Sequence, residues 1–263
     1  MTVEVSLLIA TYNWKEALRL SLLSAFAQTV LPKEILVADD GSKDDTRLLI
    51  EEMQKISPVP IIHIWHEDNG FRLSEIRNKA ISRATGDYII QIDGDIIMNR
   101  HFVEDHLDVA CEGYFVCGSR ILLSPEYSTL LLEGKKDICS ISRRALNGIR
   151  CRFLRSYLSD RYKKNDIMRL RGCNMAFWRK DLIAVNGYNE SFASWGHEDS
   201  ELAYRLIFKG VKKRFLKMGG VAFHLYHQMA SRIGEPEQMT VLKQNVMDKN
   251  SWTVNGLDKH LDV

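Results

Sequence analysis

Residues 84–98 read ATGDYIIQIDGDIIM, and this stretch decides the fold. Residues 85–87 are typical of the exit from a helix, and residues 88–92 form a short apolar run with the length of a buried strand. The run continues directly into Asp93-Gly94-Asp95. An apolar strand that ends in acidic residues indicates a parallel sheet with a ligand site at the carboxyl ends of its strands.

The residues before this stretch repeat the same alternation of strand and helix. Strands are predicted at 3–10, 34–38, 61–65 and 88–92. Helices are predicted between them, with Asn13 and Ser42 as capping residues of the first two because each has an acidic residue three positions later. This order predicts an α/β fold with a mostly parallel sheet and helices on both faces.

Polar residues follow three of the predicted strands. They are Thr11-Tyr12-Asn13, Asp39-Asp40 and Asp93-Gly94-Asp95. Because the carboxyl ends of parallel strands meet at one edge of the sheet, we expect these three clusters to lie close together. Taken alone, Asp39-Asp40 is better explained as a simple turn that caps a helix, and Thr11-Tyr12-Asn13 could likewise be no more than a capping turn. Together they predict a ligand site in which a carboxylate binds a nucleobase and an aromatic ring stacks on it.

The acidic turn suits a divalent cation. Asp93 and Asp95 can both reach one ion or its water shell, and Gly94 lets a diphosphate approach the backbone. The ion would neutralise the charge that develops on a departing nucleoside diphosphate. Many surface turns contain the same pattern, so its position after a buried strand is what favours a metal site.

A second cluster lies in the C-terminal half, at Trp195-Gly196-His197-Glu198-Asp199. Adjacent acids at the start of a helix are favoured by the helix dipole alone. A tryptophan beside a carboxylate is also suited to hold a sugar ring while one of its hydroxyls is deprotonated. In the apolar segment VAFHLYH, His224 or His227 is a candidate further metal ligand, which favours manganese because imidazole suits transition metals.

Composition and charge exclude several classes of protein. The chain has 263 residues, of which 45% are hydrophobic and 27% charged, with a net charge of +2. These values are typical of a globular protein and do not indicate nucleic-acid binding. The sequence has no apolar run of membrane-spanning length and no C-x-x-C pair among its five cysteines. Because Glu4 interrupts the apolar N-terminal stretch and no basic residues precede it, we expect no secretory signal. We expect a cytoplasmic protein with free thiols.

One stretch departs from this even charge distribution. Residues 143–171 contain ten Lys or Arg and two Asp, interleaved with apolar residues. A solvated helical face is one interpretation. The other is a peripheral contact with an anionic membrane surface at its inner face, or with a lipid-linked phosphate acceptor.

With these residues identified, the chain resembles family-2 glycosyltransferases of the GT-A fold. The matching segments are VSLLIATYN (5–13), ILVADDGSKDDT (35–46) and RNKAISRATGDYIIQIDGDIIM (77–98). DNGFRLSEIRNKAI (68–81) is similar to the bacterial chondroitin-polymerase branch. GCNMAFWRKDLIAVNGYNESFASWGHEDSELAYRL (172–206) and VAFHLYH (221–227) are similar to the C-terminal region of β-1,4-galactosyltransferases.

The resemblance implies an inverting, metal-dependent transfer of a hexose from a UDP-sugar to a glycan or lipid-linked glycan acceptor. The cofactor would be Mn²⁺ or Mg²⁺, and the pathway bacterial surface polysaccharide synthesis. A nucleotidyltransferase is an alternative, although the expected glycine-rich phosphate loop is missing from IATYNWKEAL. A non-catalytic glycan-binding module is a second alternative.

The resemblance also implies roles for individual residues. Donor binding falls to Thr11, Tyr12 and Asp40 at the uridine and to Arg77 and Asp93 near the diphosphate. Asp95 and His224 would bind the metal, with His227 competing for the second position. Asp199 would be the general base, and Glu198 and Trp195 would hold the acceptor. One departure is His197, where related sequences commonly have glycine.

The chain is expected to form a single domain with an elaborated C-terminal part. Its regions are a nucleotide-sugar-binding half (1–119), a variable basic insertion (120–171), an acceptor- and metal-binding half (172–230) and a C-terminal helical tail (231–263).

Overall fold

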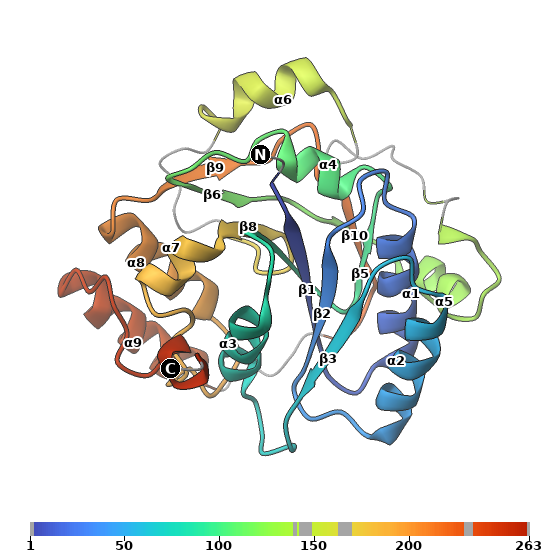
Figure 1. The fold of residues 1–263 in the computed structure, drawn as a ribbon, viewed down its shortest axis with the longest axis horizontal. Helices are drawn as coiled ribbons and strands as arrows, with labels where there is room; N and C mark the ends of the chain where they lie inside the picture. The colour runs from blue at the N-terminus through green and yellow to red at the C-terminus, as the bar shows by residue number, and fades with distance from the viewer. Residues whose placement is uncertain (1–2, 139–140, 142–148, 163–169, 229–233, 262–263) are drawn as a thin grey trace.

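A computed structural model describes residues 3–138, 141, 149–162, 170–228 and 234–261. Its centre is a seven-stranded sheet (Figure 1). In spatial order the strands are β3 (Ile61–Trp65), β2 (Glu34–Asp39), β1 (Val5–Thr11), β4 (Tyr88–Asp93), β8 (Met175–Trp178), β6 (Tyr114–Cys117) and β9 (Lys212–Phe215). Only β8 runs against its neighbours, so the prediction of a mostly parallel sheet is confirmed.

A smaller sheet lies beside the end of β4. It contains β5 (Ile96–Met98), β10 (Ala222–His224) and β7 (Ile121–Leu122), with β10 in the middle. Strand β5 continues the chain just after the acidic turn, and β10 pairs antiparallel with it so that His224 lies opposite Ile96. This pairing brings a segment from the C-terminal half next to Asp95.

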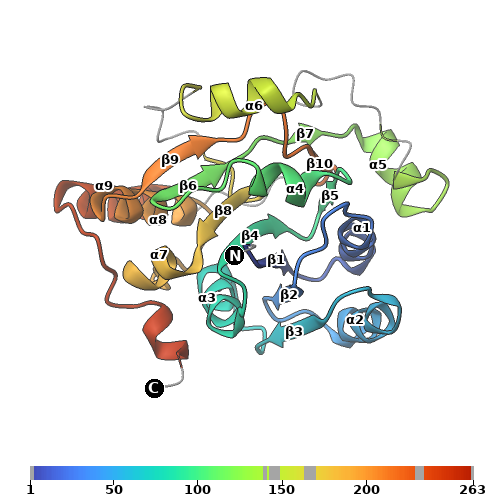
Figure 2. The ribbon, with the colours of Figure 1, turned by 45° about the horizontal axis from the view of Figure 1, so that its top comes forward.

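Helices cover both faces of the large sheet (Figures 1 and 2). One face packs against α1 (Lys15–Phe26), α2 (Asp44–Ile56) and α4 (Phe102–Leu107). The other packs against α3 (Leu73–Arg83), α7 (Arg179–Ala184) and α8 (Glu198–Phe208). The described residues also form α5 (Pro125–Leu132), α6 (Arg152–Ser159), α9 (Glu235–Met247) and the 3₁₀ helix η3 (Leu257–His260).

The side chains of β1 explain this layering. Leu7 and Ile9 belong to the core under α1 and α2, whereas Leu8 and Ala10 belong to the core under α3 and α8. Successive residues of a strand point to opposite faces, so a strand covered on both sides must be apolar at nearly every position. This is why a continuous apolar run predicted the buried strands within two residues of their observed ends.

The predicted capping roles of Asn13 and Ser42 are wrong. Helices α1 and α2 follow Trp14 and Lys43, and neither has a side-chain cap. Instead, the Ser42 hydroxyl accepts a hydrogen bond from the Asn13 amide (2.8 Å), and the Asn13 side-chain oxygen accepts one from the Lys43 amide (3.0 Å). The two polar side chains therefore join the loop after β1 to the loop after β2.

The C-terminal tail is more than the polar helix that the sequence predicted. Helix α9 is followed by η3, whose Leu257 is fully buried in the core beside α3. The Leu257 amide donates to the Asn186 carbonyl (2.9 Å), which ties the tail to the segment before α8. The last turn of the described chain thus helps to hold α3 in place.

Helix α6 is attached to the body by a buried arginine. The side chain of Arg155 is fully buried, and its Nη1 lies 2.6 Å from Asp105 and 2.8 Å from Asp108. Its Nε also donates to the Met218 carbonyl. Figure 2 shows α6 beyond β9 at the outer edge of the molecule. Of the basic range 143–171, residues 149–162 and 170–171 lie within the described part of the chain.

The predictions on cysteines and on membrane-spanning segments can be compared with the described residues. Cys111, Cys117, Cys151 and Cys173 are free thiols, as predicted. None of the described helices is both long and apolar enough to cross a lipid bilayer.

Candidate functional site

Three strand ends meet at one edge of the sheet, as the sequence predicts. Strand β1 lies between β2 and β4, with Thr11 opposite Asp39 and Ala10 opposite Asp93. The backbone joins the three ends further, because the Asp40 amide donates to the Thr11 carbonyl (3.0 Å) and the Gly94 amide to the Ala10 carbonyl (2.7 Å). The polar clusters that follow these strands therefore form one continuous surface.

The part of this edge at β1 and β2 combines an exposed aromatic ring with a buried carboxylate. Tyr12 is 52% exposed, and its hydroxyl donates to Asp68 (2.9 Å). Asp40 is buried, with His66 Nε2 at 2.7 Å from one oxygen and the Arg72 amide donating to the other (3.1 Å). An aromatic ring with a free face next to a fixed hydrogen-bond acceptor suits a planar nitrogenous ring such as a nucleobase.

The acidic turn lies tightly against β1. A side chain at Gly94 would place its Cβ 3.0 Å from the Thr11 hydroxyl and 3.1 Å from the Ala10 carbonyl. Any larger residue would push the turn outward, so glycine keeps Asp93 and Asp95 close to the strand end. Thr11 is itself buried beneath the turn.

Asp95 lies with two histidines in a cluster that can hold a metal ion. Its Oδ2 is 3.4 Å from His224 Nε2 and 3.1 Å from His227 Nε2, and the candidate ligand atoms all lie within 4.8 Å of one another. The other oxygen, Oδ1, is buried and has no hydrogen-bond partner among the described residues. Burial lowers the pKa of His224, which keeps its ring in the neutral form that coordinates metals.

Arg77 gathers three carboxylates from different elements. Its guanidinium is only 1% exposed and lies 3.1 Å from Asp93, 3.5 Å from Glu198 and 3.2 Å from Asp199. It comes from α3, whereas the acids come from the end of β4 and the first turn of α8. One buried cation thus faces three acids, so the cluster carries excess negative charge whenever all three are ionised.

The buried acids bind protons more tightly than exposed ones. Burial, reinforced by Asp199, raises the pKa of Glu198 to about 7, while Arg77 opposes this rise. Burial likewise raises the pKa of Asp93 to about 6, again against the effect of Arg77. Groups that exchange protons near neutral pH are suited to general acid–base chemistry.

The segment that precedes α8 contains an exposed aromatic side chain and a residue with a left-handed backbone. Trp195 is 40% exposed. His197 precedes the helix in the left-handed conformation (φ 70°), which favours glycine. A glycine at this position would adopt the same backbone without strain.

The predicted site residues thus fall into three adjacent groups. Thr11, Tyr12 and Asp40 lie at the β1 and β2 ends, Arg77 and Asp93 lie with Glu198 and Asp199, and Asp95 lies with His224 and the alternative His227. The sequence missed His66 and Asp68, which contact Asp40 and Tyr12. It also missed Tyr188 and Gln91, which are buried behind Asp199. A polar residue inside an apolar strand, as Gln91 is, was the available signal.

Comparisons with protein families match most of the chain. The model of glycosyl transferase family 2 matches residues 6–183. A model described as the N-terminal domain of galactosyltransferase matches residues 154–228. The two matches together include every residue of the three groups.

Individual relatives agree with this assignment. Chondroitin synthase from Escherichia coli is 27% identical over 84% of this chain, which confirms the resemblance noted from the sequence. The chain spans 34% of that protein's length.

Solved structures confirm the GT-A type of fold. The mannosyltransferase PcManGT from Pyrobaculum calidifontis, in complex with GDP-Man and Mn²⁺, superposes with a TM-score of 0.65 at 17% identity, covering 94% of this chain and 65% of the other. S. aureus TarS 1-349 in complex with UDP-GlcNAc also gives 0.65 at 15% identity, covering 93% and 67%.

The raised pKa of Glu198 predicts a pH-dependent stability in the absence of metal. Between its ordinary pKa of 4.5 and about 7, the folded protein holds a proton that the unfolded chain has lost. The free energy of unfolding should therefore fall as pH rises through this window, by up to about 3 kcal/mol. Glu198→Gln should lose this component. Urea unfolding at pH 5 and pH 8 should therefore show a larger fall in the free energy of unfolding for the wild type than for this variant.

Glu52, exposed on α2, provides the matched control. Glu52→Gln should keep the wild-type dependence on pH. If Glu198→Gln also keeps it, Glu198 does not hold a proton in the folded state at neutral pH.

Proposed function

The chain belongs to glycosyl transferase family 2, and we propose that it is an inverting, metal-dependent glycosyltransferase that moves a sugar from a UDP-sugar to a glycan or lipid-linked glycan acceptor. The observation that carries this proposal is the single sheet edge on which a metal-type cluster, Asp95 with His224 and His227, adjoins the acid cluster around Arg77. The similarity to a bacterial chondroitin synthase supports a place in surface polysaccharide synthesis.

The donor nucleotide is proposed to lie at the ends of β1 and β2. The exposed ring of Tyr12 offers a stacking face, and Asp40 and Thr11 offer fixed oxygens for the uracil and ribose. One structural neighbour binds UDP-GlcNAc and another binds GDP-Man. Experiments on the donor should therefore include both nucleotides.

The diphosphate would then extend toward Asp93 and Asp95. The unpartnered Oδ1 of Asp95 and the two imidazoles fit a divalent cation. A bound cation supplies Lewis-acid stabilisation of the charge that develops on the leaving diphosphate. Imidazole ligands suit Mn²⁺ better than Mg²⁺, which prefers oxygen ligands, so Mn²⁺ is the proposed cofactor. Both histidines are proposed as ligands, since each lies within reach of the same carboxylate oxygen.

Transfer itself is assigned to the first turn of α8. Trp195 and Glu198 hold the acceptor sugar, and Asp199 takes the proton from its attacking hydroxyl. The acceptor oxygen forms a bond to the anomeric carbon on the face opposite the diphosphate. The bond from that carbon to the diphosphate oxygen breaks, and UDP leaves with the electron pair. Configuration is inverted because attack and departure occur on opposite faces.

The two alternatives have less support. The family match points to glycosyl transfer and not to nucleotidyl transfer. A non-catalytic glycan-binding module would have no need to keep Asp95, Asp199 and two metal-type histidines together.

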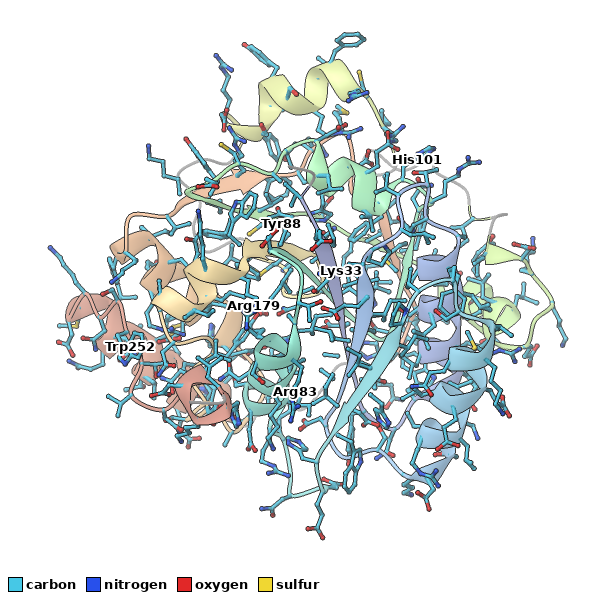
Figure 3. All side chains as sticks on the ribbon, in the orientation of Figure 1. Lys33, Arg83, Tyr88, His101, Arg179 and Trp252 are labelled. Atoms are coloured by element: carbon cyan, nitrogen blue, oxygen red, sulfur yellow. The ribbon has the colours of Figure 1, made fainter. Side chains whose placement is uncertain are left out.

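A peripheral membrane contact is proposed for the outer face of α6. Arg155 on its inner face is buried, while Phe153 is 90% and Tyr157 is 58% exposed. The exposed Arg152 and Arg161 flank these rings, with the Arg161 guanidinium 4.3 Å above the ring of Tyr157. Side chains of α6 project outward at the top of Figure 3. Exposed aromatic rings between arginines suit an anionic lipid surface.

The metal assignment predicts the binding of Mn²⁺ to single variants. Asp95→Ala should abolish binding, and His224→Gln and His227→Gln should each weaken it about tenfold or more, because each removes a ligand. Titration calorimetry without substrates provides the measurement. His101→Gln is the control, because His101 precedes α4 and its ring contacts Glu104 outside the proposed ligand set; it is labelled in Figure 3. Unchanged binding in His227→Gln would leave His224 as the sole histidine ligand.

The base assignment predicts that Asp199→Asn retains Mn²⁺ and donor binding but lowers transfer about 10²- to 10⁴-fold. Release of nucleoside diphosphate should be followed with UDP-GlcNAc, UDP-GalNAc, UDP-Glc, UDP-Gal, UDP-GlcA and GDP-Man, using chondroitin oligosaccharides and p-nitrophenyl glycosides as acceptors. Asp87→Asn, at an exposed position before β4, is the control. Release from no donor with any metal would overturn the proposed function, and wild-type transfer by Asp199→Asn would overturn the choice of base.

The α6 contact predicts co-sedimentation with vesicles of phosphatidylcholine and phosphatidylglycerol, weakened by salt. The double change Phe153→Ser and Tyr157→Ser should abolish it without loss of stability, because both side chains are exposed. Met247→Ser, at an exposed position on α9, should leave it unchanged. Failure of the wild type to sediment with these vesicles at low salt would leave α6 as a solvated face.

A further inference from the structure

A buried tyrosine lies directly behind the proposed base. Tyr188 is fully buried, and its hydroxyl oxygen is 3.0 Å from Asp199 Oδ1 and 2.8 Å from Gln91 Oε1. None of the roles assigned above involves it. It touches neither of the surfaces proposed for donor and acceptor, so its effect on the reaction would be exerted through Asp199.

The tyrosine is fixed on several sides. The side chain of Asn78 donates to the Tyr188 carbonyl (2.8 Å) and accepts from the Tyr188 amide (2.7 Å). The Arg77 guanidinium lies 5.2 Å from the centre of its ring. Adjacent residues of α3 thus hold both the backbone and the ring, which leaves only the hydroxyl proton free to rotate.

Gln91, the second acceptor beside the Tyr188 hydroxyl, is also held in place. The amide nitrogen of Gln91 donates to the Gly172 carbonyl (3.0 Å), so its amide oxygen faces Tyr188. Gly172 also packs against the base, since a Cβ at this position would overlap the carboxylate of Asp199. Of the described residues, both donors to Asp199 reach Oδ1, one from Arg77 and one from Tyr188. Oδ2, which lies against Gly172, is the oxygen to which we assign the acceptor's proton.

One hydroxyl proton therefore faces two acceptors, and we propose that Tyr188 is a positioning residue that donates to Asp199 while this carboxylate is ionised and to Gln91 once it has taken the acceptor's proton. The inference rests on the proposed function, in which Asp199 is the base. An ionised oxygen is the stronger acceptor, and a neutral carboxyl is no better than an amide oxygen. Rotation of the hydroxyl thus avoids a buried unpaired donor in either state.

Two further observations agree with this role. Burial raises the pKa of Tyr188 well above its ordinary value, so the hydroxyl stays protonated and remains a donor. Within the part of the chain that the structure describes, the other charged or titratable groups near Asp199 include Arg77 from α3, Asp93 from β4, Glu198 from α8 and the buried thiol of Cys117 from β6. Replacing the tyrosine by phenylalanine removes the hydroxyl and leaves all four in place.

The test is Tyr188→Phe, assayed for transfer with the donors and acceptors given above. We expect kcat to fall about 10- to 100-fold with little change in the KM of the donor, as for loss of a hydrogen bond to a charged group. The acidic limb of the kcat/KM profile should move to higher pH, because the ionised carboxylate loses a donor. A purely structural role would lower activity without moving this limb.

Tyr88→Phe is the matched control. Tyr88 is equally buried, at the opposite end of β4 from the acidic turn, and its hydroxyl has no hydrogen-bond partner among the described residues. It is labelled in Figure 3. This variant should keep both the wild-type rate and the wild-type pH profile.

A double variant separates this inference from the function on which it rests. In the Asp199→Asn background, Tyr188→Phe should cause no further loss of transfer, because the two residues act as one unit. Two outcomes would overturn the role of Tyr188 alone. In one, transfer depends on Asp199 but Tyr188→Phe leaves it unchanged. In the other, the loss caused by Tyr188→Phe is just as large in the Asp199→Asn background. Absence of transfer by the wild type with every donor would instead overturn the proposed function.

Discussion

The site depends on the balance of charge around the guanidinium of Arg77. Three carboxylates, one buried and two partly exposed, could not lie side by side without it, because they lose hydration and repel one another. A single arginine does not neutralise all three, and the deficit explains why Glu198 and Asp93 bind protons near neutral pH. The same side chain fixes α3, the end of β4 and the start of α8 in one arrangement. The arrangement of these three elements and the raised pKa values of Glu198 and Asp93 therefore share one cause, the partial burial of three carboxylates around the single positive charge of Arg77.

The acidic turn joins this charge cluster to the metal-type cluster. Asp93 points to Arg77 and Asp95 to the two histidines, although only Gly94 separates them. Because Gly94 lies against Thr11, the turn has little freedom to move away from β1. A change of charge in the cluster around Arg77 therefore acts on the metal-type cluster across the turn, and the reverse holds as well. The two clusters therefore lie on either side of one short turn.

The sequence predicted the parts of this arrangement that follow from local patterns. Apolar runs revealed the strands, and the polar residues after them revealed the edge, because parallel strands bring their carboxyl ends together. Contacts between distant segments were harder to predict. Asn13 and Ser42 had the pattern of helix caps but bond to each other's loops. The pairing of β10 with β5 brings His227 as close to Asp95 as His224, which spacing along the chain could not decide.

Arg155 and Arg77 are both buried, but they serve different purposes in this fold. At α6, Arg155 is paired with Asp105 and Asp108, and well-packed apolar side chains of similar volume would hold the helix about as well. At the site an apolar side chain could not replace Arg77, because it would leave three neighbouring carboxylates without a cation. Behind the site, the buried Tyr188 hydroxyl lies within hydrogen-bond distance of both Asp199 and Gln91. Polar groups buried behind a candidate base therefore help to identify it, together with the acids that surround it.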